Sequence, residues 1–229
     1  MFNKTLFDKI SGLDHKGVIF DVDGTMLDSM PIWNSIASDY LISRNRTPLP
    51  GLNEELRALG GHEIPSYFQK KYGITESADG ILDGLNELLE SFYFNFAPLK
   101  PGVLDVLEQF KANGVRMCVA TATDRRLIEP ALTRCGVIGF FERIYTCSEE
   151  MTSKRNPDIY IRAAEFLGAA VSETLVFEDA LYAIKTAKNA GFTVAAVYDE
   201  DARDQQDEIN SICDYYIRSW TDLALPANL

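Results

Sequence analysis

The chain has 229 residues, of which 46% are apolar and 24% are charged, proportions that argue against disorder and predict a sizeable buried core. The formal net charge of −12 disfavours a nucleic-acid-binding surface or a surface for anionic membranes, because either would need a basic face. A small phosphorylated substrate is compatible with this charge, since a few local cations and a bound metal ion reverse the sign of a pocket.

The N-terminal residues and the cysteines indicate where the protein works. Residues 1–16 carry charges throughout and contain no apolar stretch, so we predict no signal peptide. No run approaches the roughly 18 apolar residues that a membrane span requires. The four cysteines form no C-x-x-C pair, and Cys118 lies in an apolar run that is typical of a buried, reduced thiol. We expect a soluble, cytoplasmic protein with no nucleic-acid or membrane partner.

The first predicted element is a short strand at residues 17–21, an apolar run that ends in Asp21. Its β-branched and aromatic residues, without strict alternation, are typical of a strand buried on both faces. An Asp-Gly turn alone would explain Asp23 and Gly24. It does not explain Asp21, whose carboxylate stands where the strand should still be apolar and therefore needs a compensating cation or hydrogen-bond donors. With Asp23 two residues away, Mg²⁺ is the natural compensation.

A long helical segment follows this strand directly. Residues 31–97 show helical periodicity and no convincing strand. We predict a separate helical cap domain over 31–97 and a core domain made of residues 1–30 and 98–229. The alternative is that these helices belong to one larger layered domain. A helical module inserted here would stand over the carboxyl end of the sheet, where α/β folds bind ligands.

From residue 101 onward, helices and strands alternate. Helical patterns cover residues 101–114, 124–136 and 156–168. Further apolar runs predict strands at residues 115–121, 143–147, 174–179, 192–198 and 213–217. In the helix at 101–114 we expect Val103, Leu104, Leu107 and Phe110 on one face. The repeat predicts an α/β fold: a Rossmann-like, doubly wound parallel sheet with a helical cap inserted after the first strand.

The segment DVDGTMLDS at residues 21–29 closely resembles the first motif of the haloacid dehalogenase-like hydrolases, in their phosphatase branch. The remaining motifs of that superfamily follow in order at the ends of later strands. They are Thr121, Lys154 three residues before Pro157-Asp158, and the pair Glu178-Asp179. Each alone has an ordinary explanation, as a strand-end threonine, a solvated lysine or a helix cap. Their joint occurrence in register makes the match specific.

The resemblance implies an Mg²⁺-dependent phosphomonoester hydrolase that acts on a small phosphorylated metabolite through an aspartyl-phosphate intermediate. It implies Asp21 as nucleophile, Asp23 as general acid and base, and Thr121 and Lys154 as holders of the phosphoryl oxygens. The implied metal site consists of Asp21, Asp23, Glu178 and Asp179. The implied substrate contacts in the core domain are Gly24, Thr121, Ala122 and Lys154.

The predicted cap should select the substrate, because the core motifs contact only the phosphoryl group. Arg44 and Arg46 are candidates, since guanidinium groups suit a second anionic group on the substrate. His62 follows two glycines in a loop that we expect to be flexible, and it is a third candidate. The alternative is that all three side chains are ordinary polar surface.

The chain departs from the family pattern at two positions. The family commonly has Gly-Lys-Pro around its lysine, whereas this chain has Ser153-Lys154-Arg155. Arg155 either adds a second cation near the phosphate or points into solvent. Ala183 stands where the family usually has glycine after the acidic pair, a change that favours the following helix and leaves the metal ligands in place.

Rival interpretations share part of this residue set. A sugar phosphomutase similar to β-phosphoglucomutase would share the core, the cap and the aspartyl-phosphate step, but its cap signature is absent and Thr121 is the commoner choice in phosphatases. A receiver domain would gather similar residues but needs only about 120 residues and no helical insertion. A silent binding protein would not need the intact acidic set. No long heptad pattern is present, so a monomer is the default expectation.

Overall fold

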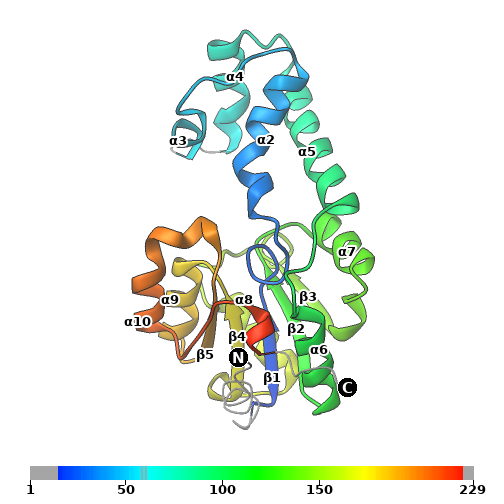
Figure 1. Cartoon of the computed structure of the whole chain (residues 1–229), viewed down its shortest axis with the longest axis vertical. Helices are drawn as coiled ribbons and strands as arrows, with labels where there is room; N and C mark the ends of the chain where they lie inside the picture. Colours follow the sequence, from blue (N-terminus) through cyan, green and yellow to red (C-terminus); the bar gives the residue numbers. More distant parts are fainter. Residues whose placement is uncertain (1–14, 58, 60, 224–229) are drawn as a thin grey trace. The chain divides into compact units, whose positions relative to one another are not determined.

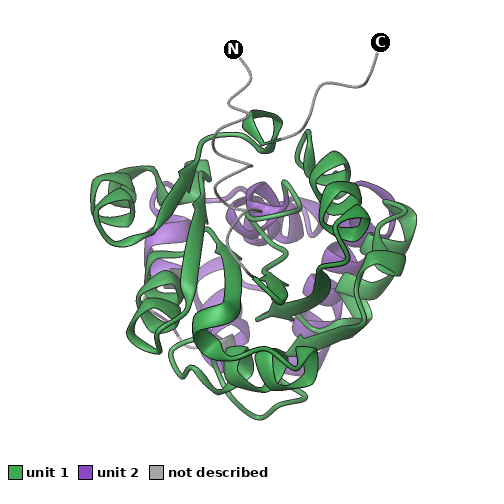
Figure 2. Cartoon of the chain, turned by 90° about the horizontal axis from the view of Figure 1, so that it is seen from below, with its two compact units in different colours: residues 1–28, 97–229 green, residues 29–96 purple. Residues whose placement is uncertain are grey.

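The computed structural model describes residues 15–57, 59 and 61–223. Nearly all of the segment on which the absence of a signal peptide was predicted lies outside these ranges. The described residues fall into two compact units (Figure 2). Unit 1 contains the chain up to Asp28 and from Ala97 onward, and unit 2 is Ser29–Phe96.

Unit 1 is built on a six-stranded sheet in which every pairing is parallel (Figure 1). The strands are β1 (Gly17–Phe20), β2 (Arg116–Thr121), β3 (Arg143–Thr146), β4 (Thr174–Glu178), β5 (Thr193–Val197) and β6 (Tyr215–Ile217). Their order is β3-β2-β1-β4-β5-β6, so the chain builds outward from β1 in one direction and then from β4 in the other. Each strand coincides with a predicted one, and the doubly wound parallel sheet is confirmed.

Helices cover both faces of this sheet. They are α6 (Val103–Ala112), α7 (Arg125–Arg134), α8 (Asp158–Leu167), α9 (Leu181–Asn189) and α10 (Gln206–Ile212). Short 3₁₀ turns are η2 (Ile138–Phe140), η3 (Val171–Glu173), η4 (Glu200–Gln205) and η5 (Trp220–Asp222). Residues of α8, α9 and α10 form one buried cluster with Ile19 and Val176 of the central strands. On the other face, the Phe20 ring stacks on Phe177 and also meets Phe110 of α6 and Trp220 of η5.

Helix α6 corrects one expectation about its buried face. Val103, Val106, Leu107 and Phe110 are buried, whereas Leu104 is 41% exposed. The buried positions follow the spacing i, i+3, i+4, i+7 of one helical face, and Leu104 lies one residue, about 100°, away from Val103. The prediction that Leu104 shares this face was wrong, because the buried arc extends through Val106 on its other side and leaves Leu104 beyond its edge.

Unit 2 contains helices and no strand among its described residues (Figure 1). They are α2 (Met30–Ser43), α3 (Leu52–Arg57), α4 (Ile64–Tyr72) and α5 (Ala78–Asn95), with the turn η1 (Gly61–Glu63) before α4. The rings of Tyr40 and Phe68 stack in its core with centroids 5.5 Å apart. A Cβ at Gly84 of α5 would lie 2.7 Å from the Tyr40 ring, so the close packing of α5 on α2 requires glycine there.

The cysteines and the helices bear on the expected environment of the protein. All four cysteines are free thiols, and burial raises the pKa of Cys118 to about 12, as expected for an unreactive core thiol. Among the residues that the structure describes, none of the helices combines the length and the apolar character that crossing a membrane requires.

Candidate active site

The candidate site lies at the carboxyl ends of β1 and β4, the two central strands. Phe20 is opposite Phe177 in the parallel ladder, and the Asp21 backbone N–H donates to the Phe177 carbonyl at 3.0 Å. The next residue of each strand, Asp21 and Glu178, therefore lies at the same sheet edge. This is the point where the direction of chain progression reverses, which is the usual ligand position in open α/β sheets.

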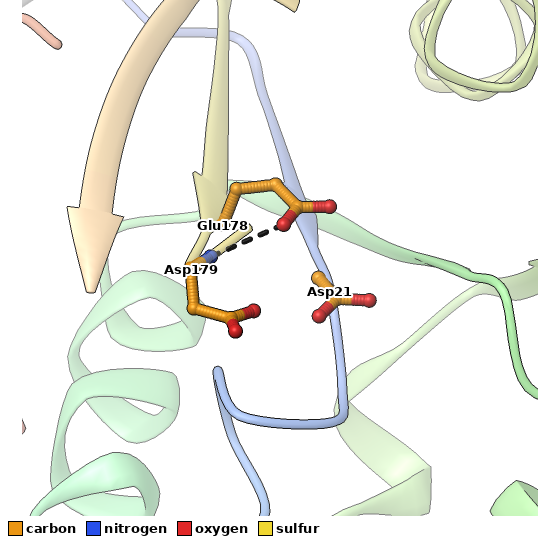
Figure 3. A group of neighbouring side chains, drawn as sticks. All are labelled: Asp21, Glu178 and Asp179. Carbon is orange, nitrogen blue, oxygen red and sulfur yellow. Dashed lines mark hydrogen bonds between the residues drawn. The ribbon is translucent and has the colours of Figure 1, made fainter. Parts of the chain in front are cut away.

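Three carboxylates meet at this edge (Figure 3). Asp21, Glu178 and Asp179 are buried, and their carboxylate oxygens offer ligand atoms that all lie within 4.8 Å of one another. The Thr25 hydroxyl lies between two of them, 3.1 Å from Asp21 Oδ2 and 2.9 Å from Asp179 Oδ1. Three of the predicted metal residues, which lie at or next to the ends of β1 and β4, are thus brought together.

Lys154 supplies the positive charge of this cluster. Its ammonium donates to Asp21 Oδ1 and to Glu178 Oε1, and the residue is only 4% exposed. Burial lowers the pKa of Lys154, but the charges of Asp21 and Glu178 outweigh burial and raise that pKa above its usual range. The lysine is therefore fully charged and aimed at the proposed nucleophile.

Glu178 is surrounded by hydrogen-bond donors. Its Oε1 accepts from Lys154 and from the Tyr160 hydroxyl at 2.9 Å, and its Oε2 accepts from the backbone N–H groups of Asp179 and Ala180 at 3.1 and 3.3 Å. These donors leave little of the carboxylate for a direct metal contact, and they fit a role in orienting Lys154. Tyr160 was not predicted from the sequence.

The pKa of Asp179 reflects the excess of negative charge in the cluster. Burial, reinforced by the charges of Asp21 and Glu178, raises the pKa of Asp179 well above its ordinary value. Three carboxylates and one ammonium leave two net negative charges when all are ionised. A divalent cation with a preference for oxygen ligands would neutralise them, so this residue set fits Mg²⁺.

The turn that follows β1 carries Asp23, Gly24 and Thr25. The Val22 carbonyl accepts from the N–H groups of Met26 and Leu27, each at 2.8 Å, and Gly24 has φ of 74°, a conformation that favours glycine. Asp23 is half-buried in this turn, two residues beyond Asp21. The predicted nucleophile and the predicted acid and base thus belong to one tightly hydrogen-bonded turn.

Two further side chains contact this turn, and neither was predicted from the sequence. The Lys100 ammonium donates to the Gly24 carbonyl, to the Tyr198 carbonyl at 3.0 Å and to Asp199 Oδ2 at 2.8 Å. The Trp220 indole N–H donates to the Thr25 carbonyl at 2.9 Å.

The predicted phosphate-binding residues on β2 lie at the same edge of the sheet. Thr121 is the last residue of β2, which pairs with β1, and it is buried. Its hydroxyl accepts from the Thr123 N–H at 3.2 Å, which fixes the start of the following loop. Ala122 is exposed in that loop.

The two departures from the family pattern have clear positions. Arg155 is exposed, and its guanidinium lies over the Tyr182 ring, 4.8 Å from the centroid. Ala183 is fully buried in the first turn of α9. The helix that follows the acidic pair therefore forms with alanine at that position.

The two arginines among the candidate substrate residues of unit 2 have protein partners. Arg44 donates to both carboxylate oxygens of Glu76, at 2.6 and 3.3 Å, and lies over the Tyr40 ring. Arg46 donates to the carbonyls of Tyr72 and Gly73, at 2.8 and 3.3 Å, where α4 ends. His62 is exposed in η1. Both arginines thus have structural roles within unit 2.

Comparison with known proteins identifies the family to which this chain belongs. A family model of haloacid dehalogenase-like hydrolases matches residues 15–191. The match covers more than half of the chain, and the chain belongs to this family. The resemblance predicted from the motifs is therefore confirmed.

Relatives with similar sequences include phosphatases. A phosphorylated carbohydrates phosphatase of Thermotoga maritima is 23% identical over 176 residues, covering 77% of this chain and 82% of the relative. A phosphoglycolate phosphatase of Pseudomonas syringae pv. syringae is 28% identical over 189 residues, covering 80% and 69%. The crystal structure of a candidate β-phosphoglucomutase from Thermotoga maritima has a TM-score of 0.80 at 21% identity, covering 91% and 96%, a likeness in fold. The family and its phosphatase relatives support the predicted enzyme class.

Proposed function

We propose that this chain is an Mg²⁺-dependent phosphomonoester hydrolase that acts on a small phosphorylated metabolite through an aspartyl-phosphate on Asp21. The observation that carries the proposal is the setting of Asp21. One of its carboxylate oxygens faces the Lys154 ammonium and the other faces the Thr25 hydroxyl, in a buried cluster with Asp179. A carboxylate held in this way is oriented for attack and lies beside a cation that would hold the phosphoryl group.

In the first step, an oxygen of Asp21 attacks phosphorus and the bond from phosphorus to the leaving oxygen breaks. Asp23, protonated at this stage, donates its proton to the leaving oxygen, so the product departs as a neutral alcohol. Lys154 and Thr121 hold the non-bridging oxygens as negative charge develops on them.

In the second step, the Asp23 carboxylate takes a proton from a water molecule that attacks phosphorus. The bond between phosphorus and Asp21 breaks, inorganic phosphate leaves, and both aspartates return to their starting forms. Asp23 thus acts once as an acid and once as a base, and no proton is gained or lost over the cycle.

Mg²⁺ would be held by the Asp21 and Asp179 carboxylates together with the Asp23 backbone carbonyl, and it would supply charge neutralisation at the phosphoryl oxygens. Glu178 belongs to this acidic group but is occupied by four hydrogen-bond donors. We assign it to holding Lys154 in place.

Residues 31–97 would act as the cap that selects the substrate, with residues 1–30 and 98–229 as the catalytic core. Because Arg44 and Arg46 are bound to groups of unit 2, we assign them to its stability and not to the substrate. His62 and the exposed Arg155 and Ala122 are the remaining candidates for contact with a substrate. The natural partner is then a small phosphorylated metabolite, and a monomer suffices for this chemistry.

A sugar phosphomutase is the second candidate. It uses the same attack by Asp21 and differs in the acceptor, because the phosphoryl group goes to a sugar hydroxyl instead of water. The fold likeness to a candidate β-phosphoglucomutase is compatible with both activities. Measuring whether water or a sugar hydroxyl accepts the phosphoryl group distinguishes the two activities.

The test is release of inorganic phosphate from p-nitrophenyl phosphate, 2-phosphoglycolate and a panel of sugar phosphates. Each substrate is assayed with Mg²⁺, with excess chelator, and with the variant Asp21→Asn. Glu142→Gln is the control, because it removes a charge from a surface ion pair with Arg116. We expect turnover that needs Mg²⁺, is abolished in Asp21→Asn and is unchanged in Glu142→Gln.

Two other results would change the conclusion. Interconversion of sugar phosphates in the presence of a sugar bisphosphate, without net phosphate release, would establish the mutase. Full activity of Asp21→Asn would remove the aspartyl-phosphate mechanism altogether.

A further inference from the structure

We propose that Lys100 and Trp220 form a clamp that positions the catalytic turn by holding two successive carbonyls, those of Gly24 and Thr25. Neither side chain is among the motif residues, and both are positioning residues in this assignment. The inference rests on the proposed function for its kinetic consequences, but the clamp itself can be measured without activity.

The Lys100 half of the clamp is a buried ion pair with an additional backbone contact. The Lys100 and Asp199 side chains are 15% and 6% exposed, with 2.8 Å between Nζ and Oδ2. The same ammonium donates to the Gly24 and Tyr198 carbonyls, so all three of its N–H donors are used. Asp199 is itself fixed, because its other oxygen accepts from the Asp201 N–H at 2.9 Å. The pair therefore ties the catalytic turn to the loop after β5.

The Trp220 half contacts the next carbonyl along the turn. Its indole N–H donates to the Thr25 carbonyl, and its ring packs against Phe20 and Phe177, the residues before Asp21 and Glu178. A Cβ at Gly102 would lie 2.8 Å from the Trp220 carbonyl carbon, so the segment after Lys100 packs directly on the backbone of η5. The two halves of the clamp thus support each other.

The clamp acts on the residues that carry the chemistry. Thr25 places its hydroxyl between Asp21 and Asp179, and Asp23 immediately precedes Gly24. Holding the carbonyls of Gly24 and Thr25 fixes the two peptide planes that flank Thr25, and the first of these planes begins at the residue after Asp23. Loss of the clamp would leave the substrate phosphate contacts intact but widen the range of orientations of Asp21 and Asp23, which lowers kcat more than it changes KM.

Two variants separate positioning from stability. Trp220→Phe removes the N–H donor and keeps an aromatic ring against Phe20, although the phenyl ring is smaller than the buried indole. Lys100→Met combined with Asp199→Asn removes the donor to Gly24 without leaving a buried carboxylate unpaired. The matched control is Lys188→Met with Asp214→Asn, an ion pair at 2.7 Å that contacts β5 away from the site. The measurements are kcat and KM for p-nitrophenyl phosphate and amide exchange of peptides covering residues 21–27.

We expect kcat to fall about 3- to 10-fold in Trp220→Phe, the equivalent of one ordinary hydrogen bond. In the Lys100 double variant we expect a fall of about 10- to 100-fold, with KM within a factor of about three. Amides of residues 21–27 should exchange faster in both variants and not in the control. Unchanged exchange, or equal losses in the control, would overturn the clamp. Faster exchange in a chain whose wild type releases no phosphate would sink the proposed function and leave the clamp standing.

Discussion

Charged residues are arranged in opposite ways in the two units. In unit 1, Lys154 faces the carboxylates of Asp21 and Glu178 with side chains no more than 7% exposed, and Asp179 adds a third negative charge. In unit 2, Arg44 faces one carboxylate, that of Glu76, and both side chains are about one-third exposed. The charged group in unit 1 is buried and carries a net negative charge. The ion pair in unit 2 carries no net charge and is partly exposed to water.

The two arrangements of charge differ in what they require from outside the protein. A balanced pair near the surface contributes modestly to stability and needs no further partner. A buried excess of like charge is costly, and it persists only where a cation or a charged ligand restores the balance. Arg44 and Lys154 are both plausible phosphate ligands in the sequence, but the structure leaves net charge to be compensated only around Lys154.

Removing the cation of the buried cluster should have the most severe consequence for the protein. In Lys154→Met, the cluster of three carboxylates loses the ammonium that faces Asp21 and Glu178, so we expect the free energy of unfolding in chelator to fall by about 3–5 kcal/mol. Phosphatase activity should fall at least about 1,000-fold, since the charge on the phosphoryl oxygens loses its counterpart. Urea unfolding and phosphate release measure the two effects.

Lys16→Met is the control for this variant. Lys16 forms an ion pair with Glu173 at 2.8 Å, but the side chains are 60% and 35% exposed. The unfolding midpoint of the control should stay at the wild-type value. Equal midpoints for the two variants would mean that the buried imbalance has no energetic consequence.

The second prediction concerns the pH dependence of the metal-free protein. Between the ordinary pKa of 3.8 and the raised pKa of Asp179 in the fold, the folded protein holds a proton that the unfolded chain has lost. The free energy of unfolding therefore falls as pH rises through this range. Asp179→Asn cannot titrate, so its unfolding curve should show a weaker fall with pH when measured in chelator.

Mg²⁺ should reverse this trend in the wild type. The ion binds the ionised carboxylates, and a concentration 100 times its Kd would stabilise the fold by about 2.7 kcal/mol. Asp179→Asn should lose most of that stabilisation in a thermal scan with and without Mg²⁺. A variant that gains as much from Mg²⁺ as the wild type would place the metal elsewhere.

The parts of this site that the sequence predicted share one property. Asp21, Thr121 and Glu178 each lie at or next to the end of a strand, and parallel pairing brings such ends to one edge. The apolar runs were enough to place the strands, so the motif residues could be placed with them. The exposure of Leu104 was missed because Val106, two residues on, fits the same helical face better.

The partners that complete the site could not be predicted because nothing local marks them. Lys100 is 76 residues from Gly24, and Trp220 is 195 residues from Thr25. A lysine before Pro-Gly and a tryptophan near the end of a domain have many ordinary explanations. Tyr160 lies among the apolar positions of its helix, so the sequence predicts only that it is part of the hydrophobic core. The bond from its hydroxyl to Glu178 becomes visible only in the folded structure.

Replacement of Arg44 should change stability and activity least among these variants. Replacing it by Met removes a partly exposed pair with Glu76, so we expect a loss of about 1 kcal/mol or less in the free energy of unfolding. Glu76→Gln should lower the free energy of unfolding by a similar amount. The double variant should lose less than the sum of the two single variants, because both changes remove the same interaction.

The kcat/KM for the best substrate should stay within about threefold of wild type, since the Arg44 guanidinium is already paired with the Glu76 carboxylate. A KM that rises about tenfold in Arg44→Met but not in Glu76→Gln would show that the arginine leaves its partner for the substrate. The ion pair of Arg44 with Glu76 would then exist only in the absence of substrate. Arg44 and Lys154 would both bind the substrate, and Arg44 would do so only after leaving its carboxylate partner.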